Sequence, residues 1–245
     1  MRAAVVLPTY QEAGNIAVVL PRVRAAAPFV EVVVVDDASP DGTADLAEAL
    51  GAELGAVTVV RRTGKRGFGA ACRAGFAWAL DQAFDVVVSM DADLSHDPAV
   101  LPALLRTVEE GADLVVGSRY VPGGAIPAWP LHRRALSRWG NRYATTALGL
   151  TLHDATSGYR AYRASILRQI DLDRVRANGY GFLIEMAYRV TRHGATVAEV
   201  PIVFLDRERD RSKMSATIAA EAMALVTLWG VRDRLRRAAA ALAWR

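Results

Sequence analysis

The chain has 245 residues, of which 52% are hydrophobic, so it can close the core of one large α/β domain without disulfides or structural metals. Its single cysteine, Cys72, excludes a disulfide framework and a Cys/His zinc site and fits a reducing compartment. The formal net charge of +4 is a modest excess that could serve phosphate ligands, an anionic membrane or nucleic acid. Met1 leads directly into an apolar run, without the parts of a signal peptide, so we expect a cytoplasmic protein.

The first part of the chain predicts alternating strands and helices. Three Val-rich runs, at residues 3–7, 30–35 and 86–90, each stop at a polar or acidic cluster, as buried parallel strands do. A shorter run at 57–60 predicts a further strand. Apolar residues at helical spacing predict the helices between them, at 15–27, 43–50 and 70–82. This order is typical of the first half of a doubly wound sheet.

The second part is less regular. A helix at 98–110 and a strand at 114–116 are predicted before a Gly/Pro-rich break at 121–129. The later segments predict helices at 131–148, 166–170 and 182–192, a strand at 197–204 and a terminal helix at 216–237. The apolar stretch at 216–231 contains Glu221 and is shorter than the roughly 20 residues that a bilayer-spanning helix needs. We therefore expect the chain to lie on a membrane if it meets one.

Polar residues follow three of the predicted strands at the point where each ends. They are Pro8-Thr9-Tyr10, Asp36-Asp37 and Asp91-Ala92-Asp93. Ligands of open α/β sheets collect outside the carboxyl ends of the strands. The acidic clusters are therefore expected to converge on one crevice.

The two carboxylates Asp91 and Asp93 are separated by one residue. A turn can bring both toward one hard cation that also meets a diphosphate. The alternative is an acidic turn in which Asp93 begins a cap for the helix predicted from residue 98. The spacing alone does not choose between them.

Asp36 and Asp37 also have two interpretations. With the Ser, Pro and Gly that follow, they could form only a turn and a helix cap. Adjacent like charges repel unless a ligand or donor offsets them, however. This favours a carboxylate that accepts from a nucleoside hydroxyl or base N–H.

The predicted helix at 131–148 combines arginines with aromatic and apolar residues. Arg133 and Ser137 are four residues apart and stack on one face, while Arg134, Arg138 and Arg142 form another stripe. With Trp129, Leu131, Leu136 and Trp139 nearby, the helix suits the headgroup level of a membrane. An ordinary basic surface helix with inward tryptophans is the alternative.

Several motifs occur in order over residues 3 to about 215. They are Pro8-Thr9-Tyr10-Gln11-Glu12, Val35-Asp36-Asp37-Ala38-Ser39-Pro40-Asp41-Gly42-Thr43, Gly67-Phe68-Gly69, Met90-Asp91-Ala92-Asp93-Leu94-Ser95-His96, Gly117-Ser118-Arg119-Tyr120, Thr156-Ser157-Gly158-Tyr159-Arg160, Glu199-Val200-Pro201-Ile202 and Asp206-Arg207-Glu208 with Ser212-Lys213. Together they resemble the inverting family 2 glycosyltransferases of GT-A fold, most closely the dolichol-phosphate (polyprenol-phosphate) mannose synthases.

The resemblance implies a single Rossmann-like α/β domain of GT-A fold, with a mostly parallel central sheet, over residues 1–215. Residues 216–245 would then form an amphipathic basic helix at the membrane. The implied reaction moves mannose from GDP-mannose to dolichyl or polyprenyl phosphate with inversion, using Mg²⁺ or Mn²⁺. The implied location is the cytoplasmic face of the membrane, reached through the lipid surface or a separate membrane-anchoring protein.

The resemblance also implies the site residues. The nucleotide-sugar would contact Pro8, Tyr10, Glu12, Val35, Asp37, Asp91, Ala92, Asp93, Arg119, Arg207 and Lys213. The metal would be held by Asp91 and Asp93, and the catalytic set would be Asp91, Asp93, Arg119 and Arg207. The acceptor phosphate would meet Arg119, Arg133 and Ser137. Asp210 stands where the family usually has Gly, which places an acidic charge in the 207–213 phosphate loop.

Two rival functions stay open. A polyprenyl-phosphate glucosyltransferase using UDP-glucose would share the same scaffold. A non-catalytic partner that binds nucleotide-sugar or membrane is the other, but the presence of Asp91, Asp93, Arg119 and Lys213 argues against it. No nucleic-acid motif accompanies the arginines, so we expect no nucleic-acid partner.

Overall fold

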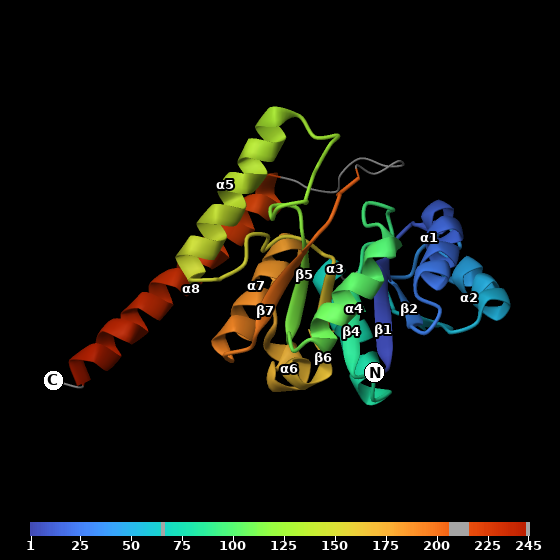
Figure 1. The fold of residues 1–245 in the computed structure, drawn as a ribbon, viewed down its shortest axis with the longest axis horizontal. Helices are drawn as coiled ribbons and strands as arrows, with labels where there is room; N and C mark the ends of the chain where they lie inside the picture. The colour runs from blue at the N-terminus through green and yellow to red at the C-terminus, as the bar shows by residue number, and fades with distance from the viewer. Residues whose placement is uncertain (65–66, 206–215, 244–245) are drawn as a thin grey trace.

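The computed structural model describes residues 1–64, 67–205 and 216–243. Its centre is a seven-stranded sheet in the order β3-β2-β1-β4-β6-β5-β7 (Figure 1). The strands are β1 Ala3–Thr9, β2 Glu31–Asp36, β3 Val57–Arg61, β4 Val86–Ser89, β5 Leu114–Ser118, β6 Arg160–Arg163 and β7 Val197–Pro201. Every pairing is parallel except those of β6, which runs antiparallel to both β4 and β5. The expected mostly parallel α/β sheet is confirmed.

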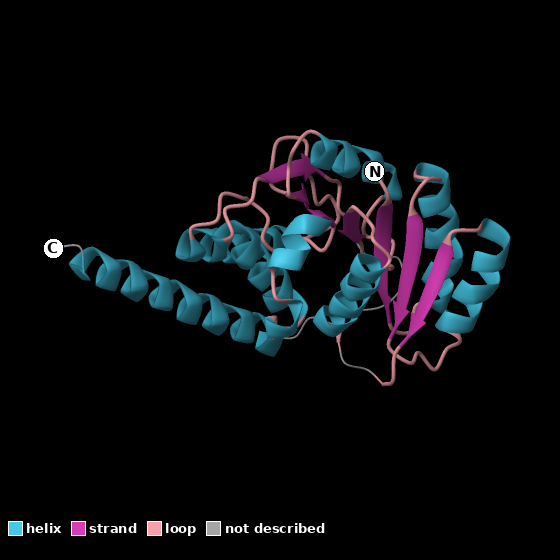
Figure 2. Cartoon of the chain, turned by 90° about the horizontal axis from the view of Figure 1, so that it is seen from below, coloured by secondary structure: helices cyan, strands magenta, loops and turns pink. Residues whose placement is uncertain are grey.

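Helices cover both faces of this sheet (Figure 2). They are α1 Ala13–Ala26, α2 Thr43–Leu54, α3 Phe68–Asp81, α4 Leu101–Glu109, α5 Leu131–Leu148, α6 Ala164–Gln169, α7 Gly179–Arg192 and α8 Ala216–Ala243, with short 3₁₀ turns at Pro98–Val100 and Leu172–Arg174. One core cluster joins α1, α2 and α4 to the sheet, and a second joins α3, α6 and α7.

The central strand shows why the predicted Val-rich runs lie in the interior. Along β1, Val5 and Leu7 belong to the first core cluster, whereas Ala4 and Val6 belong to the second. Successive side chains of a strand point to opposite faces. Because both faces are covered by helices, every position of the run is apolar, as parallel strands require.

Strand β6 is not predicted by the sequence, because Arg160 and Arg163 interrupt any apolar run. Arg160 is nevertheless fully buried. Its guanidinium donates to the backbone carbonyls of Ser157 (2.8 Å), Leu183 (2.6 Å) and Ala155 (2.6 Å). These hydrogen bonds offset the desolvation of the charge. Arg160 therefore ties β6 to the loop before it and to α7.

Helices α5 and α8 pack beside α7 around a third, smaller core cluster. In α8, Trp229 stacks on Tyr188 of α7 with ring planes 3° apart, and Tyr143 of α5 hydrogen-bonds Thr227 at 2.6 Å. Figure 1 shows the later part of α8 extending past the sheet. Among the described residues, no helix combines the length and apolarity needed to cross a bilayer.

Candidate active site

A cavity of about 470 Å³ lies at the carboxyl ends of β1, β2, β4 and β5. Eight of the residues expected at the nucleotide-sugar site line it: Pro8, Tyr10, Glu12, Asp37, Asp91, Ala92, Asp93 and Arg119. They come from four different strand ends, and the parallel order of β1, β2 and β4 brings three of these to one edge of the sheet. The crevice expected from the strand-end clusters is thus present.

Three other expected residues, among those that the structure describes, do not line the cavity. The Val35 side chain is fully buried in the core cluster under α3 and is not part of the cavity wall. Arg133 and Ser137 lie on α5, outside the lining. Arg207 and Lys213, together with Asp210, fall outside the described residues.

The backbone is strained at three of the strand ends around the cavity. Gln11, Ala38 and Leu94 have φ angles of 58°, 55° and 65°. Non-glycine residues rarely adopt this left-handed region, and such strain clusters at functional sites, where the surrounding structure holds it in place. Each of the three lies directly within a motif that follows β1, β2 or β4.

At the end of β2, the two neighbouring carboxylates have different environments. Asp36 closes the turn, because it accepts from the backbone N–H of Ser39 at 2.8 Å and from the Ser39 hydroxyl at 2.5 Å. Asp37 instead lines the cavity, paired with Arg62 and accepting from the backbone N–H of Gly67 at 3.0 Å. Gly67 has φ +86°, a conformation that favours glycine. Asp36 therefore follows the turn interpretation, whereas Asp37 faces the space where a ligand would lie.

At the end of β4, Asp91 and Asp93 both line the cavity. Asp93 Oδ1 accepts from the Ser95 hydroxyl at 2.6 Å and from its backbone N–H at 3.1 Å, while the backbone N–H of Asp91 donates to Nδ1 of His96 at 3.2 Å. Asp93 does not cap the following turn. That role belongs to Asp97, which accepts from the backbone N–H of Ala99 at 3.1 Å.

These carboxylates fit a hard divalent cation. Among the residues described, no group of three or more His, Cys, Asp and Glu side chains could hold a metal alone. Mg²⁺ is typically held by one or two carboxylates together with substrate phosphates. Gly158 keeps the space beside Asp91 open, because an added Cβ there would lie 2.9 Å from Asp91 Oδ1. Two carboxylates beside an open space are thus compatible with a cation that a diphosphate also binds.

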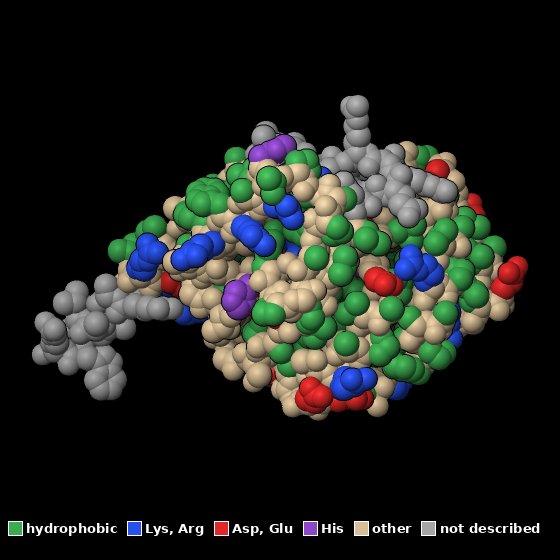
Figure 3. All heavy atoms as spheres, turned by 45° about the horizontal axis from the view of Figure 1, so that its top comes forward, with side chains coloured by type: hydrophobic (Ala, Val, Ile, Leu, Met, Phe, Trp, Pro, Cys, Tyr) green, Lys and Arg blue, Asp and Glu red, His purple; other side chains and the backbone are tan. Residues whose placement is uncertain are grey.

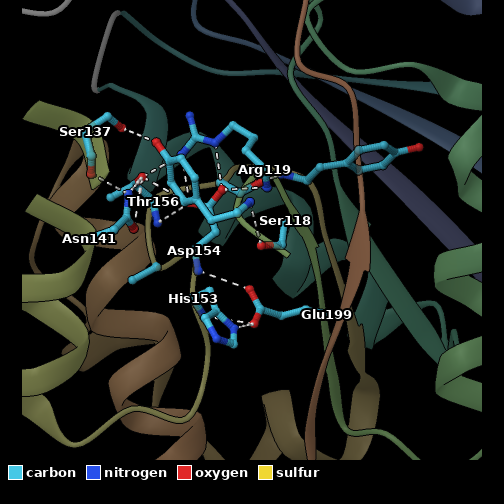
Figure 4. Close-up of polar contacts among 12 residues, drawn as sticks. Ser118, Arg119, Ser137, Asn141, His153, Asp154, Thr156 and Glu199 are labelled. Atoms are coloured by element: carbon cyan, nitrogen blue, oxygen red, sulfur yellow. Dashed lines mark hydrogen bonds and ion pairs between the residues drawn. The ribbon is translucent and has the colours of Figure 1, made fainter. Parts of the chain in front are cut away.

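Arg119 is held at the cavity by a network of side-chain hydrogen bonds (Figure 4). Its Nε and Nη2 donate to Oδ2 and Oδ1 of Asp154, both at 2.7 Å, and Nη2 also donates to the Thr156 hydroxyl at 2.7 Å. Burial alone would raise the pKa of Asp154, but the charge of Arg119 and its hydrogen bonds outweigh burial and hold that pKa below its usual range. The pair is therefore ionised inside the protein.

Aromatic rings surround the Arg119 guanidinium and connect it to α5. Its central carbon lies 5.3 Å from the centroid of Tyr120 and 5.9 Å from that of Trp129, distances at which a cation is attracted to an aromatic face. The Arg133 guanidinium lies 3.8 Å from the same Trp129 ring. The Tyr120 hydroxyl donates to Ser137 Oγ at 2.6 Å. The three expected acceptor-phosphate residues therefore share one aromatic cluster, although only Arg119 reaches the cavity.

The outward surface of α5 is apolar and basic. Leu131, Leu136 and Trp139 are 75%, 68% and 59% exposed, and α5 contains four arginines and no acidic residue. Figure 3 shows Lys/Arg side chains in a row next to hydrophobic ones at the end of the molecule where α5 and α8 lie. Trp129 is buried, as in the surface-helix interpretation, whereas Trp139 is not.

Several residues of the site have no functional role predicted from the sequence. His96, Thr156, Asn178, Tyr180 and Phe204 line the cavity, and Asp154 supports it from behind. Thr156 begins a motif quoted for the resemblance, but Asp154 lies two residues before that motif. One signal in the sequence points to Asp154. A buried arginine is almost always paired with an acidic residue, and Asp154 is a carboxylate that lies next to the 156–160 motif, which itself contains none.

Comparisons with known proteins agree with this geometry. Residues 4–171 match the family described as "Glycosyl transferase family 2". The chain is 50% identical over 234 residues to the "Undecaprenyl-phosphate mannosyltransferase" of Micrococcus luteus, a match that covers 96% of each chain. It is 49% identical over 238 residues to the "Polyprenol monophosphomannose synthase" of Mycolicibacterium smegmatis, covering 97% of this chain and 90% of the relative.

A solved structure supports the fold. Glucosyl-3-phosphoglycerate synthase from Mycobacterium tuberculosis, in complex with Mn²⁺, UDP and glucosyl-3-phosphoglycerate, superimposes with a TM-score of 0.66 at 23% identity, covering 95% of this chain and 79% of that chain. The expected GT-A fold is thus confirmed. Matched over most of its length by the family and by relatives at half identity, the chain belongs to glycosyl transferase family 2.

Proposed function

We propose that this glycosyltransferase transfers mannose from GDP-mannose to a polyprenyl phosphate, with inversion at the anomeric carbon, giving polyprenyl-phosphate mannose and GDP. The observation that carries the proposal is the cavity, which joins Asp37, Asp91 and Asp93 to the paired Arg119 at one edge of the sheet. The names of the two relatives at about half identity support both the sugar and the lipid.

On the donor side, the cavity offers carboxylates for the nucleoside and a cation site for the diphosphate. Asp37 is fixed by Arg62 and Gly67, so a nucleoside hydroxyl or base N–H meets an oriented acceptor. Asp91 and Asp93 would hold Mg²⁺ or Mn²⁺, which when bound offsets the charge of the departing diphosphate. The solved neighbour from Mycobacterium tuberculosis is a complex with Mn²⁺ and UDP, which is consistent with this assignment.

On the acceptor side, no catalytic base is needed. A phosphate monoester has a second pKa of about 6 and is largely deprotonated at neutral pH, so its oxygen can attack the anomeric carbon directly. The chemical problem is to bring two anions together despite their repulsion. Arg119 at the cavity wall and Arg133 on α5 would position the acceptor phosphate and offset its charge.

The lipid chain requires access from a membrane. The exposed Leu131, Leu136 and Trp139 lie on a helix with arginines, a composition suited to the interface of an anionic bilayer. We place α5 at the cytoplasmic surface of the membrane, with α8 beside it. This placement holds whether or not a separate protein anchors the enzyme.

The test offers GDP-mannose, UDP-glucose and UDP-GlcNAc in turn with one polyprenyl phosphate and identifies the glycolipid by mass spectrometry. Formation of a hexosyl lipid from GDP-mannose, and not from the two UDP-sugars, is expected. A product from UDP-glucose alone would replace the proposal by the glucosyltransferase. Donor binding without any product would favour the non-catalytic rival.

A further inference from the structure

Asp154 lies behind the cavity and not in its wall, yet it is completely buried and ionised. It accepts from three donors of Arg119: the backbone N–H at 3.1 Å, Nε at 2.7 Å and Nη2 at 2.7 Å. These bonds fix both the start and the end of the Arg119 side chain. Nη1 of Arg119 makes no hydrogen bond to a described residue.

The loop that carries Asp154 is itself held in place from a second side. Glu199 of β7 accepts from the backbone N–H of Asp154 at 3.1 Å and from that of His153 at 2.8 Å (Figure 4). Asp154 is thus anchored to the sheet independently of Arg119. A carboxylate fixed in this way can set the position of its partner, because it does not follow the partner's movements.

The same loop also orients α5. The Thr156 hydroxyl, which accepts from Arg119, accepts from Nδ2 of Asn141 at 3.1 Å. Asn141 is buried on α5, one turn after Ser137, whose carbonyl accepts from the same amide at 3.0 Å. Arg119 and the helix that carries Arg133 and Ser137 are therefore positioned by one hydrogen-bonded loop.

We propose that Asp154 is a positioning residue of the transfer reaction: it holds the Arg119 guanidinium at the cavity wall with the Nη1 side presented to phosphate oxygens. The proposal rests on the proposed function, since it assigns Arg119 to the phosphates that this reaction brings together. Without the Asp154 carboxylate, the guanidinium keeps its charge but loses its orientation. Asp154 and Thr156 use the Nε and Nη2 hydrogens, so the two hydrogens on Nη1 remain for phosphate oxygens, and their direction depends on that orientation.

The test is a double-mutant cycle on kcat/KM for polyprenyl phosphate, using Asp154→Asn, Arg119→Ala and the double variant. Asp154→Asn alone is expected to lower kcat/KM by about tenfold or more, corresponding to the loss of one charge-assisted contact. If Asp154 acts through Arg119, the same change in the Arg119→Ala background has little further effect on kcat/KM. Equal effects in both backgrounds would overturn the proposal.

Two further variants keep the result interpretable. Asp233→Asn removes another buried carboxylate, which pairs with Arg192 at 3.5 Å and lies outside the cavity. This variant therefore reports the effect of lost stability alone. It is expected to keep the wild-type kcat/KM per folded site. Thr156→Val removes the third contact of the guanidinium together with the hydrogen bond from Asn141, but it leaves the Asp154 carboxylate in place, so it is expected to give a smaller loss of kcat/KM than Asp154→Asn. If Asp154→Asn does not fold, Thr156→Val with an unchanged kcat/KM would contradict the proposal.

The cycle uses the nucleotide-sugar from which the wild-type enzyme forms a glycolipid, and folded sites are counted by calorimetric nucleotide stoichiometry. A donor other than GDP-mannose would contradict the proposed function and leave the cycle valid. If GDP-mannose is the donor and the losses of kcat/KM in the two single variants are additive, the result contradicts the positioning role of Asp154 but not the proposed function.

Discussion

Arg119 and Asp154 form a bidentate ion pair with side chains 3% and 0% exposed, which joins the end of β5 to the loop before β6. Removing one partner of a buried pair leaves the other charge uncompensated, which costs about 3–5 kcal/mol. We therefore expect Asp154→Asn to lower the free energy of unfolding by about 3 kcal/mol or more in urea titrations at pH 7. A loss no larger than that of a surface substitution would show that the pair adds nothing to stability.

The difference in the free energy of unfolding between wild type and Asp154→Asn should also depend on pH. The pKa of Asp154 is lower in the folded protein than the roughly 3.9 of an unfolded aspartate. Its ionisation therefore stabilises the fold above about pH 4, and this contribution is lost as the pH falls through the folded-state pKa. The stability difference between wild type and Asp154→Asn should be constant from about pH 7 to 5 and shrink below about pH 4. A difference that does not change with pH would contradict an ionised Asp154.

The carboxylates of β4 give a prediction about the donor. Asp91→Ala and Asp93→Ala should each abolish transfer and weaken metal-dependent binding of GDP-mannose, because one carboxylate cannot hold cation and diphosphate together. Asp97→Ala is the matched control, since Asp97 lies in the same loop but caps the next turn outside the cavity. Metal-dependent activity retained in both Asp91 and Asp93 variants would refute the cation site.

Removal of the metal tests the same site without mutation. Activity should disappear in EDTA and return with Mg²⁺ or Mn²⁺, hard cations that prefer oxygen ligands. The measurement is glycolipid formation after dialysis and after titration with each cation. Full activity in metal-free buffer would mean that Asp91 and Asp93 act in another way.

A variant of Arg133 distinguishes effects on the acceptor from effects on donor binding. Arg133→Ala should raise KM for polyprenyl phosphate or lower kcat by about tenfold or more, because a charge-assisted contact to phosphate contributes roughly 1.5–3 kcal/mol. GDP-mannose affinity, measured by calorimetry, should be nearly unchanged, because Arg133 lies outside the cavity wall. Lysine should rescue only in part, because it lacks the planar guanidinium.

The exposed helical Arg106 of α4 provides the control, and Arg106→Ala should leave both quantities at wild-type values. If Arg133→Ala weakens donor binding as much as acceptor turnover, the placement of the acceptor phosphate beside α5 is wrong.

The sequence predicts the first half of the fold well, because β1, β2 and β4 are buried on both faces and therefore contain continuous apolar runs. Strand β6 cannot be found this way. Arg160 is stabilised there by three backbone carbonyls from other segments, and no local pattern reports such contacts.

The candidate site likewise contains residues that the sequence predicts and residues that it does not. Residues directly after strands, such as Asp37 and Asp91, can be predicted because topology alone brings strand ends together. The Asp154 pairing cannot, because its partner Arg119 is 35 residues away and the contact depends on the antiparallel insertion of β6. The family resemblance implies that Val35 contacts the nucleotide-sugar, but alternation along β2 turns its side chain into the core.

Mannosyl transfer is tested most directly by the structure of the product, determined by NMR after incubation of the wild-type protein with GDP-mannose, Mg²⁺ and polyprenyl phosphate. We expect one mannose joined through its anomeric carbon to the lipid phosphate, with inverted configuration and one GDP released for each linkage. A product of retained configuration, free mannose in place of a glycolipid, or no turnover at all would contradict it.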